Sequence, residues 1–284
     1  MSGAVNTAVK DSEFQQMRDF IYAQCGIFIP DNRKYLLQNR LFNRIKTLNL
    51  KDVNEYLYYL KYDSGRRQEL PRLFEVITTN ETSFYRNPPQ LKVFQDIVLP
   101  RILNGLRQSG RRNLNIWSAG CSTGEEPYTL AIIIHEVLKS EASSWNIRIT
   151  ANDLSEAVLR TARQGVYSDY SLRSTPKEII TRYFVEEAGR YKVCQDLKKL
   201  ITFGQLNLND RAQVKMVPRS DIIFCRNVII YFDDAMKKRV IGEFYDNLVP
   251  GGALFIGHSE SLHHISRTLK PTYHTGSIVY FKDT

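Results

Sequence analysis

The chain has few cysteines and no cysteine pair with the spacing of a metal site. Its four cysteines are far apart and form no Cys-X-X-Cys motif: they are Cys25, Cys121, Cys194 and Cys225. Structural zinc sites need closely spaced thiolates or imidazoles, and a disulfide framework needs more cysteines in a shorter chain. The sequence therefore predicts neither a metal site nor disulfide bonds, and we interpret the cysteines as small apolar side chains.

No hydrophobic run is long enough to cross a membrane. A spanning helix needs about 20 consecutive apolar residues, and the longest apolar stretches, such as residues 130–134 and 221–232, are shorter. Residues 1–10 also lack the apolar core of a signal peptide. These absences predict a cytoplasmic protein.

Positive charge is in excess, with 39 Lys and Arg against 30 Asp and Glu, which gives a formal net charge of +9. Such an excess favours an acidic partner, which could be nucleic acid, an anionic membrane or an acidic protein surface. No basic stretch is rich in the aromatic residues that stack on bases. We therefore expect no nucleic-acid partner.

Residues 1–75 have only helical patterns and predict a small all-α domain. The first helix should be capped by Ser12 and end near Gly26, and others are expected at residues 32–48, 52–62 and 69–78. One face of the 32–48 helix is basic, with no acid before Lys51; its basic residues are Arg33, Lys34, Arg40, Arg44 and Lys46. That face is either simply solvated or docks an acidic partner, and the lack of compensating acids favours docking.

Residues 76–284 alternate strands and helices, which is typical of a parallel sheet with helices on both faces. Strands are expected at residues 113–118, 147–151, 221–225, 253–257 and 277–281, and helices at 125–139, 155–164 and 233–248. Three more strand candidates lie at 183–187, 190–195 and 200–204. Because short turns join them, they predict an antiparallel subdomain, about residues 182–204, inserted into the larger α/β fold.

The loop after the first expected strand carries the most specific signal, Trp117-Ser-Ala-Gly-Cys-Ser-Thr-Gly-Glu-Glu-Pro-Tyr128. It lacks the Gly-X-Gly-X-X-Gly pattern of dinucleotide sites, which disfavours a nicotinamide-dependent oxidoreductase. Glu125 and Glu126 would repel a phosphate but suit a cationic ligand, such as the ammonium and sulfonium of S-adenosylmethionine. Alternatively, both acids merely favour the helix dipole at an exposed first turn.

Asp153 ends the second expected strand, where an acid can accept hydrogen bonds from both ribose hydroxyls. It could instead cap the following helix, although Asn152 or Ser155 could also do so. The loop, the paired acids and Asp153 together indicate a cofactor that contains a nucleoside but no phosphate.

Five blocks, in this order, make residues 11–281 resemble the chemotaxis receptor methyltransferases, the CheR family. They are Thr78-Thr-Asn-Glu-Thr-Ser-Phe-Tyr-Arg86, the loop from Trp117 to Tyr128, Ala151-Asn-Asp-Leu-Ser155, Phe224-Cys-Arg-Asn-Val-Ile-Ile-Tyr-Phe-Asp233 and Gly257-His-Ser-Glu260. The resemblance implies a helical N-terminal domain and a class I methyltransferase (Rossmann-like) sheet with an inserted antiparallel subdomain. It also implies methyl transfer from S-adenosylmethionine to receptor glutamates, with S-adenosylhomocysteine as the product.

The resemblance implies site residues at the matching positions. The implied cofactor contacts are Asn80, Thr82, Arg86, Glu126, Asp153, Asn207, Leu208, Arg226 and Asn227. Arg86 and Tyr231 match positions next to the transferred methyl group and are the expected catalytic residues. Arg33, Lys34, Arg40 and Arg44 are the expected contacts to the receptor methylation region.

Other functions stay open at this point. One is a class I methyltransferase that acts on nucleic acid or a small molecule, and another is a catalytically silent receptor-binding adaptor. Within the family, some members bind a receptor tail peptide through a glycine-containing loop of the antiparallel subdomain. The corresponding turn here, Glu186-Glu-Ala-Gly-Arg190, is short, so we expect direct recognition of the methylation region by a monomer.

Overall fold

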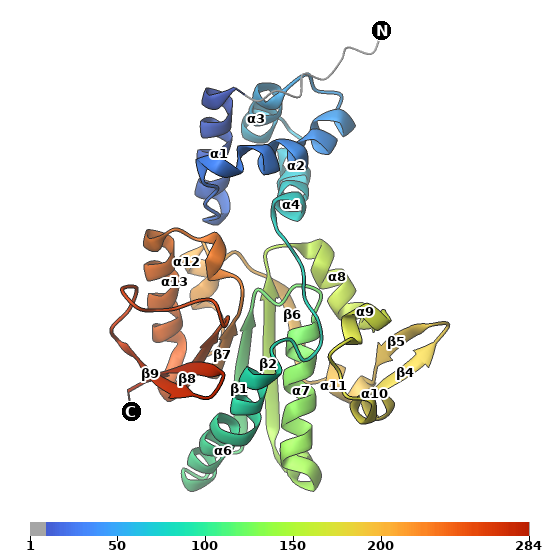
Figure 1. Ribbon diagram of the computed structural model, residues 1–284, viewed down its shortest axis with the longest axis vertical. Helices are drawn as coiled ribbons and strands as arrows, with labels where there is room; N and C mark the ends of the chain where they lie inside the picture. Colours follow the sequence, from blue (N-terminus) through green and yellow to red (C-terminus); the bar gives the residue numbers. More distant parts are fainter. Residues whose placement is uncertain (1–9, 284) are drawn as a thin grey trace. The chain divides into compact units, whose positions relative to one another are not determined.

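The computed structural model describes residues 10–283. By the density of internal contacts the chain divides into two units (Figure 1). The first comprises residues up to Thr79 together with Tyr231–Asp233, and the second comprises Asn80–Ile230 and the chain from Asp234 onward. The short return segment is hydrogen bonded within the first unit, because Phe28 N donates to Tyr231 O (2.8 Å) and Tyr22 Oη to Asp233 (3.0 Å).

The first unit contains the expected helices. They are α1 (Asp11–Cys25), α2 (Lys34–Thr47) after a 3-10 turn (Asp31–Arg33), α3 (Val53–Tyr62) and α4 (Arg66–Ile77). Gly26 ends α1 in the left-handed conformation (φ 74°), as predicted. The expected cap at Ser12 is wrong: the helix begins two residues earlier, because the Glu13 carboxylate accepts a hydrogen bond from Lys10 N (2.9 Å) and makes Lys10 the capping residue.

A buried ion pair joins α2 to α4. Arg44 donates from Nε to Glu69 Oε1 (2.8 Å) and from Nη2 to Glu69 Oε2 (2.6 Å). Tyr56 Oη, from α3, donates to the same Oε1 (2.7 Å), and Glu69 is 4% exposed. Because three hydrogen bonds from two residues satisfy this carboxylate, the network fixes three helices to one another.

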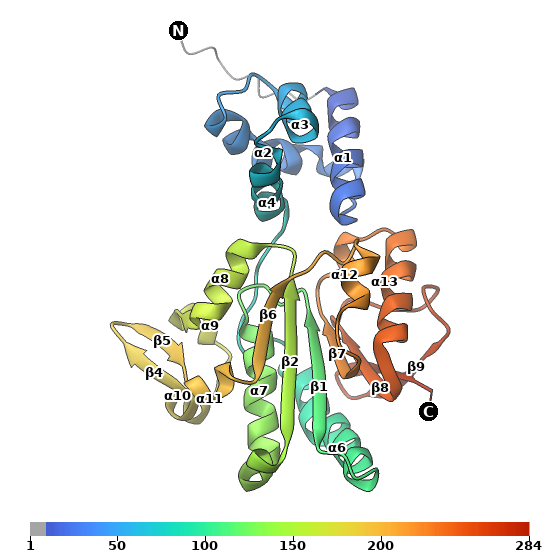
Figure 2. The same cartoon turned by 180° about the vertical axis from the view of Figure 1, so that it is seen from behind.

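The second unit is built around a seven-stranded sheet in the order β6-β2-β1-β7-β8-β10-β9 (Figures 1 and 2). Its strands are β1 (Asn113–Ala119), β2 (Asn146–Asp153), β6 (Ile201–Gln205), β7 (Ser220–Cys225), β8 (Leu248–Ile256), β9 (Leu269–His274) and β10 (Ser277–Lys282). The first five run parallel, and β10 is antiparallel to both β8 and β9. The parallel α/β sheet was predicted, whereas its antiparallel edge was not.

Helices connect the parallel strands. The longest are α7 (Glu125–Leu138), α8 (Glu156–Gln164) and α13 (Asp234–Asn247), and the shorter ones are η3 (Lys139–Ser144), α9 (Asp169–Leu172), α10 (Lys177–Tyr183), α11 (Gln195–Lys198), α12 (Arg211–Lys215) and η4 (Ile229–Tyr231). Figures 1 and 2 show that α7 covers one face of the sheet. Strand order reverses between β1 and β7, and ligands of doubly wound folds bind outside the carboxyl ends of the strands at such a reversal.

The inserted antiparallel sheet differs from the prediction in its third strand. It consists of β3 (Val166–Tyr167), β5 (Arg190–Val193) and β4 (Phe184–Glu187), in that order. The strand expected at residues 200–204 instead pairs in parallel with β2, and the expected turn before it is α11. This follows from the crossover through α8 to α11, which returns the chain to the edge of the main sheet. Ala188 and Gly189 form the tight turn between β4 and β5, both with positive φ.

Several elements had no counterpart in the sequence prediction, including α12 and two stretches that contact β10. One is the helical stretch of α5 (Pro88–Val93), the π-helical η2 (Phe94–Val98) and α6 (Leu99–Gln108), which packs on β1 and β10. The other is the edge strand β9, which pairs along its whole length with β10. Pro271 makes β9 hard to predict from the sequence, since a proline argues against a central strand and is tolerated mainly on edge strands.

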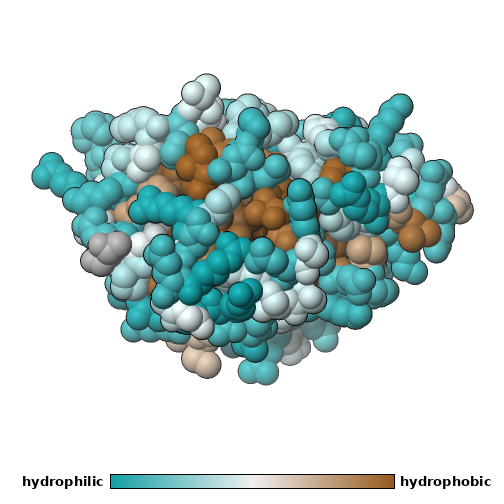
Figure 3. Space-filling model, turned by 90° about the horizontal axis from the view of Figure 1, so that it is seen from below, coloured by the Kyte–Doolittle hydropathy of each residue, from teal (hydrophilic) through white to brown (hydrophobic). Residues whose placement is uncertain are grey.

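Within residues 10–283, no helix is long and apolar enough to span a membrane. Seen from the end where α6 lies, the surface is mainly hydrophilic, with some hydrophobic side chains visible between polar ones (Figure 3). Apolar side chains contribute much of the surface of any folded protein, so their presence on this face does not by itself indicate a site.

We predict that Arg44→Met destabilises the helical unit by about 1–3 kcal/mol, because it leaves the Glu69 carboxylate buried without its cation. The range is set below that of a fully buried pair because one-fifth of the Arg44 side chain is exposed. Hydrogen exchange of the α2 and α4 amides measures the change. Lys46→Met, on the exposed side of the same helix, is the control; equal protection in both variants would contradict the prediction.

Candidate functional site

The loop after β1 lies at the strand-order reversal and is fixed by the end of β2. Gly120 N and Cys121 N both donate to Asn152 O (2.8 and 2.9 Å). Gly120 has a φ of 77°, and a Cβ there would meet the Val228 side chain at 2.3 Å. The loop therefore requires glycine for both its backbone conformation and its close approach to the segment after β7.

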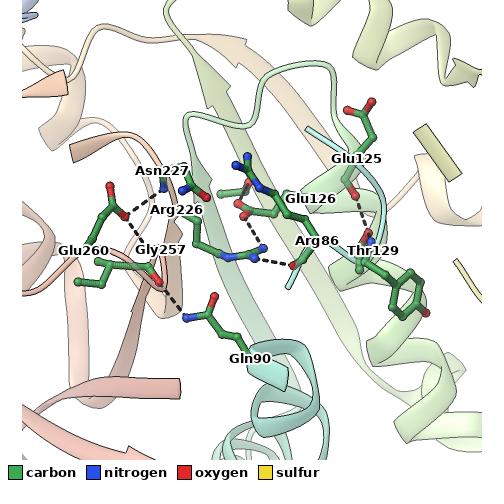
Figure 4. Close-up of polar contacts among 12 residues, drawn as sticks. Arg86, Gln90, Glu125, Glu126, Thr129, Arg226, Asn227, Gly257 and Glu260 are labelled. Atoms are coloured by element: carbon green, nitrogen blue, oxygen red, sulfur yellow. Dashed lines mark hydrogen bonds and ion pairs between the residues drawn. The ribbon is translucent and has the colours of Figure 1, made fainter. Parts of the chain in front are cut away.

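Glu126, in the first turn of α7, points to the end of β7 (Figure 4). Its carboxylate accepts hydrogen bonds from Ser118 Oγ (2.8 Å) and Arg226 Nη1 (3.2 Å). Burial raises the pKa of the Glu126 carboxyl above its ordinary value, and the Arg226 guanidinium opposes that rise. A desolvated carboxylate of this kind gains from a further positive charge placed beside it.

Arg226 connects Glu126 to the 80–86 segment. It is 8% exposed, and its Nη2 donates to Arg86 O (2.5 Å) (Figure 4). Its Nε is a buried donor with no acceptor among the described residues. The guanidinium of Arg86 itself reaches Glu81 O (2.8 Å). Arg226 therefore holds the backbone of Arg86 and keeps one donor for a ligand.

Glu125 does not share the environment of Glu126, contrary to the expectation that both acids face a ligand. The Glu125 carboxylate accepts hydrogen bonds from Thr123 Oγ1 (2.7 Å) and Ser171 Oγ (3.2 Å) and is 2% exposed. Adjacent positions on a helix point about 100° apart, so only one of the two can face the reversal point. Glu125 is therefore a structural residue that ties α7 to α9.

Asp153, at the end of β2, has two backbone donors. Ser122 N (2.8 Å) and Ser155 N (3.0 Å) donate to its carboxylate. Burial raises the pKa of Asp153, and these hydrogen bonds oppose the rise. Ser155, not Asp153, caps α8, since its Oγ accepts from Val158 N (3.5 Å). Asp153 is thus not needed as a cap and keeps acceptor capacity for hydroxyl donors.

The other expected cofactor contacts belong to segments that are hydrogen bonded to Ser122 or to Asp153. Asn80 O accepts a hydrogen bond from Ser122 Oγ (3.3 Å), next to Asp153. Thr82 is half-buried between Asn80 and Arg86. Asn207 and Leu208 follow Leu206, whose N donates to Asp153 O (2.9 Å). The structure thus brings the expected contacts of the second unit to the carboxyl edge of one sheet.

Glu260 organises the segment after β7 and was missed as an individual residue. Its carboxylate accepts hydrogen bonds from Asn227 N (3.0 Å), Ile230 N (3.1 Å) and Gly257 N (2.5 Å) (Figure 4). It is 9% exposed, so it carries a buried charge that these backbone donors help to compensate. The available signal was an acid one turn after the end of a late strand, in Gly257-His-Ser-Glu260.

Four residues in the surrounding loops have unfavourable backbone conformations. They are Tyr85 (φ 53°), Asn87 (φ 61°), Ser122 (φ 49°) and Asn227 (φ 59°). Such conformations cost free energy for residues other than glycine and cluster at functional sites. Their concentration around Arg86, Ser122 and Asn227 supports a ligand site at this edge.

The remaining expected residues are divided between the two units. Tyr231 belongs to the helical unit and Arg86 to the second unit. Within the helical unit, Arg44 is held by Glu69, Arg40 donates to Ile77 O and Thr79 Oγ1, and Lys34 pairs with Asp11 (2.7 Å). Arg33 is exposed. Three of the four expected receptor contacts therefore already have internal partners.

No group of three or more His, Cys, Asp or Glu side chains that could hold a metal is present among residues 10–283. Cys121 and Cys225 are free and buried, and burial raises the pKa of both thiols. Neither cysteine has the lowered pKa of a nucleophile.

Known proteins resemble this chain over nearly its whole length. Residues 12–78 match the family model "CheR methyltransferase, all-alpha domain" and residues 80–277 match "CheR methyltransferase, SAM binding domain". "Chemotaxis protein methyltransferase 2" of Vibrio cholerae is 34% identical, with 96% of this chain and 94% of that protein covered. "Chemotaxis protein methyltransferase" of Escherichia coli is 33% identical, covering 92% and 88%. The second unit is therefore an S-adenosylmethionine-binding methyltransferase domain, and the chain belongs to the CheR methyltransferase family.

Proposed function

We propose that this protein transfers a methyl group from S-adenosylmethionine to glutamate carboxylates on chemotaxis receptors, forming methyl esters. The observation that supports this most strongly is the Glu126–Arg226 pair with Asp153 at the strand-order reversal, in a chain that matches a chemotaxis methyltransferase over 96% of its length. The other product is S-adenosylhomocysteine. The proposed site of action is the cytoplasm, where the methylation region of a receptor would be the partner.

The residues at the reversal point fit the cofactor. The desolvated Glu126 carboxylate suits the positive charge of the ligand, and Asp153 suits the two ribose hydroxyls. The free Nε of Arg226 can donate to the ligand carboxylate. Asn80, Thr82, Asn207, Leu208 and Asn227 are proposed as further contacts. When bound, the cofactor supplies an electrophilic methyl group.

The acceptor needs no general base. A glutamate side chain has a pKa of about 4.3, so it is ionised and nucleophilic near neutral pH. The protein then has to align the attacking oxygen with the methyl group. We assign this to Arg86, which can hold one carboxylate oxygen and leave the other free, and to Tyr231, whose hydroxyl can orient the acceptor. Holding both oxygens would stabilise the reactant and slow the step.

The basic residues of α2 and of the 3-10 turn before it are proposed as receptor contacts, and the four residues have unequal roles. Arg33 is exposed, and Lys34 pairs only with an exposed aspartate, so both can reach an acidic surface. Arg40 and Arg44 serve the helical unit through their internal bonds. The tight turn between β4 and β5 supports direct recognition of the methylation region rather than capture of a tail peptide.

A methyltransferase acting on another acceptor is distinguished by the stability of the product. We predict that label from methyl-labelled S-adenosylmethionine enters a purified receptor cytoplasmic fragment and is released as methanol by mild alkali, because esters are hydrolysed whereas N-methyl and C-methyl groups are not. Label that survives alkali would indicate a different acceptor. Cofactor binding without any transfer would favour a silent adaptor.

We predict that Arg86→Ala lowers kcat about 100-fold while the dissociation constant of S-adenosylmethionine changes little. The magnitude is that of removing one donor from a preorganised site. Steady-state methylation and calorimetric cofactor binding separate the two quantities. Arg160→Ala, an exposed arginine on α8, serves as the control. An unchanged kcat would remove the catalytic assignment of Arg86.

We predict that Glu260→Gln lowers kcat by about 10-fold or more, since the amide cannot accept from all three backbone donors and leaves at least one unsatisfied. The loss should appear in kcat more than in the KM for receptor, because the segment carrying Asn227 is displaced rather than the docking surface. The exposed Glu178 on α10 provides the matched Glu→Gln control. Normal kinetics in Glu260→Gln would show that the segment holds its conformation without the carboxylate.

A further inference from the structure

A polar cavity of about 240 Å³ lies at the carboxyl end of β8 and is partly open to solvent. Its lining comes from three parts of the second unit. They are Gln90 on α5, then Ile256, Gly257, His258 and Glu260 at and after the end of β8, and His274, Gly276, Ser277 and Ile278 around the β9–β10 turn. The cavity is smaller than the roughly 300–1,000 Å³ of typical small-molecule pockets. Its size suits a single polar side chain.

Three buried polar atoms of the lining have no hydrogen-bond partner in the part of the chain that the structure describes. They are Gln90 Oε1, His274 Nε2 and Ser277 Oγ. Gln90 is 2% exposed, and its orientation is fixed because Nε2 donates to Ile256 O (2.8 Å) (Figure 4). Its Oε1 must therefore be the unpaired acceptor. Native proteins rarely leave several such atoms together without a partner.

The fold holds this lining in place. His274 and Ser277 face each other across the β9–β10 pair, and Gly276 makes the turn with a φ of 83°. A Cβ at Gly276 would meet Pro89 Cβ at 2.6 Å, so the turn packs directly on the residue before Gln90. The three unpaired atoms are thus brought together by specific backbone packing.

The cavity adjoins the candidate methyl-transfer site. Gly257 and Glu260 form part of its lining, and Glu260 also accepts the hydrogen bond from Asn227 N. A Cβ at Gly257 would meet Asn227 N at 3.0 Å. A side chain in the cavity would therefore lie beside the segment that follows β7.

The unpaired atoms favour an uncharged occupant with both donors and acceptors. Gln90 Oε1 needs a donor, and Ser277 Oγ can donate to an acceptor. Glu260 offers little to a cation, because its oxygens already accept three backbone hydrogen bonds. A carboxylate would face Glu260 and Gln90 Oε1, and a buried charge without a counter-ion is costly. A carboxamide carries the required donor and acceptor in one planar group.

We propose that this cavity binds a carboxamide side chain, glutamine or asparagine, of the protein that is methylated, next to the glutamate that accepts the methyl group. The inference rests on the proposed function, since it takes the occupant from the acceptor protein. The cavity would then act as a specificity subsite. A carboxamide at the right distance from the acceptor glutamate would strengthen recognition of the acceptor protein.

Binding can be measured without methyl transfer. The full chain has five histidines, so its histidine-labelled ¹⁵N spectrum is simple, and His274→Gln identifies the His274 signal. The probes are N-acetyl-glutamine methylamide and the matching glutamate, lysine and norvaline compounds. We expect only the glutamine probe to shift the His274 signal. Ser277→Ala should weaken its binding about 3- to 10-fold, the effect of one lost hydrogen bond, whereas Ser259→Ala, on the exposed neighbouring turn, should not.

The outcomes separate this inference from the proposed function. Stronger binding of the glutamate or lysine probe would overturn the carboxamide assignment. No shift with any probe, in a protein that still methylates a receptor fragment, would show that the cavity holds only water. A glutamine shift in a protein that transfers no methyl group to receptors would support the subsite while the proposed acceptor fails.

Discussion

The candidate site depends on the buried ion pair between Glu126 and Arg226. Removing two charges from water costs several kcal/mol each, and only good geometry with additional hydrogen bonds offsets that cost. Ser118 supplies one such bond to Glu126, and Arg86 O supplies another to Arg226. The pair therefore joins β1, α7, the residue after β7 and the 80–86 segment at one point.

The position of the site residues on the sheet could be predicted from the sequence, because it follows from the order of strands and helices along the chain. Apolar strands followed by helices place the ends of β1, β2 and β7 at one edge, which is where Asp153 and Arg226 were expected and lie. The direction in which each side chain points could be predicted less well than its position. Glu125 and Glu126 are equivalent acids in the sequence, and only the helix phase separates the one that binds Ser171 from the one that pairs with Arg226.

Contacts between distant segments were beyond the sequence analysis. The basic helix appeared uncompensated because no acid lies between residues 32 and 51, yet Glu69 compensates Arg44 from α4. The edge strand β9 was missed because Pro271 and exposed polar residues hide its alternation, whereas its neighbour β10 has the apolar residues of a half-buried strand. In each case the missing information was a partner that only the folded chain brings close.

Residues that follow β8 contact both the candidate cofactor site and the cavity proposed for the acceptor protein. Glu260 holds the backbone of Asn227 on the donor side, while Gly257 and Glu260 line the cavity proposed for the acceptor protein. Methyl transfer requires the oxygen, the methyl group and the sulfur to be aligned closely, and small displacements cost large factors in rate. A single buried carboxylate that fixes both sides relative to one strand limits such displacements. On this argument, the acid of Gly257-His-Ser-Glu260 acts by position, and its charge serves the backbone rather than the reaction.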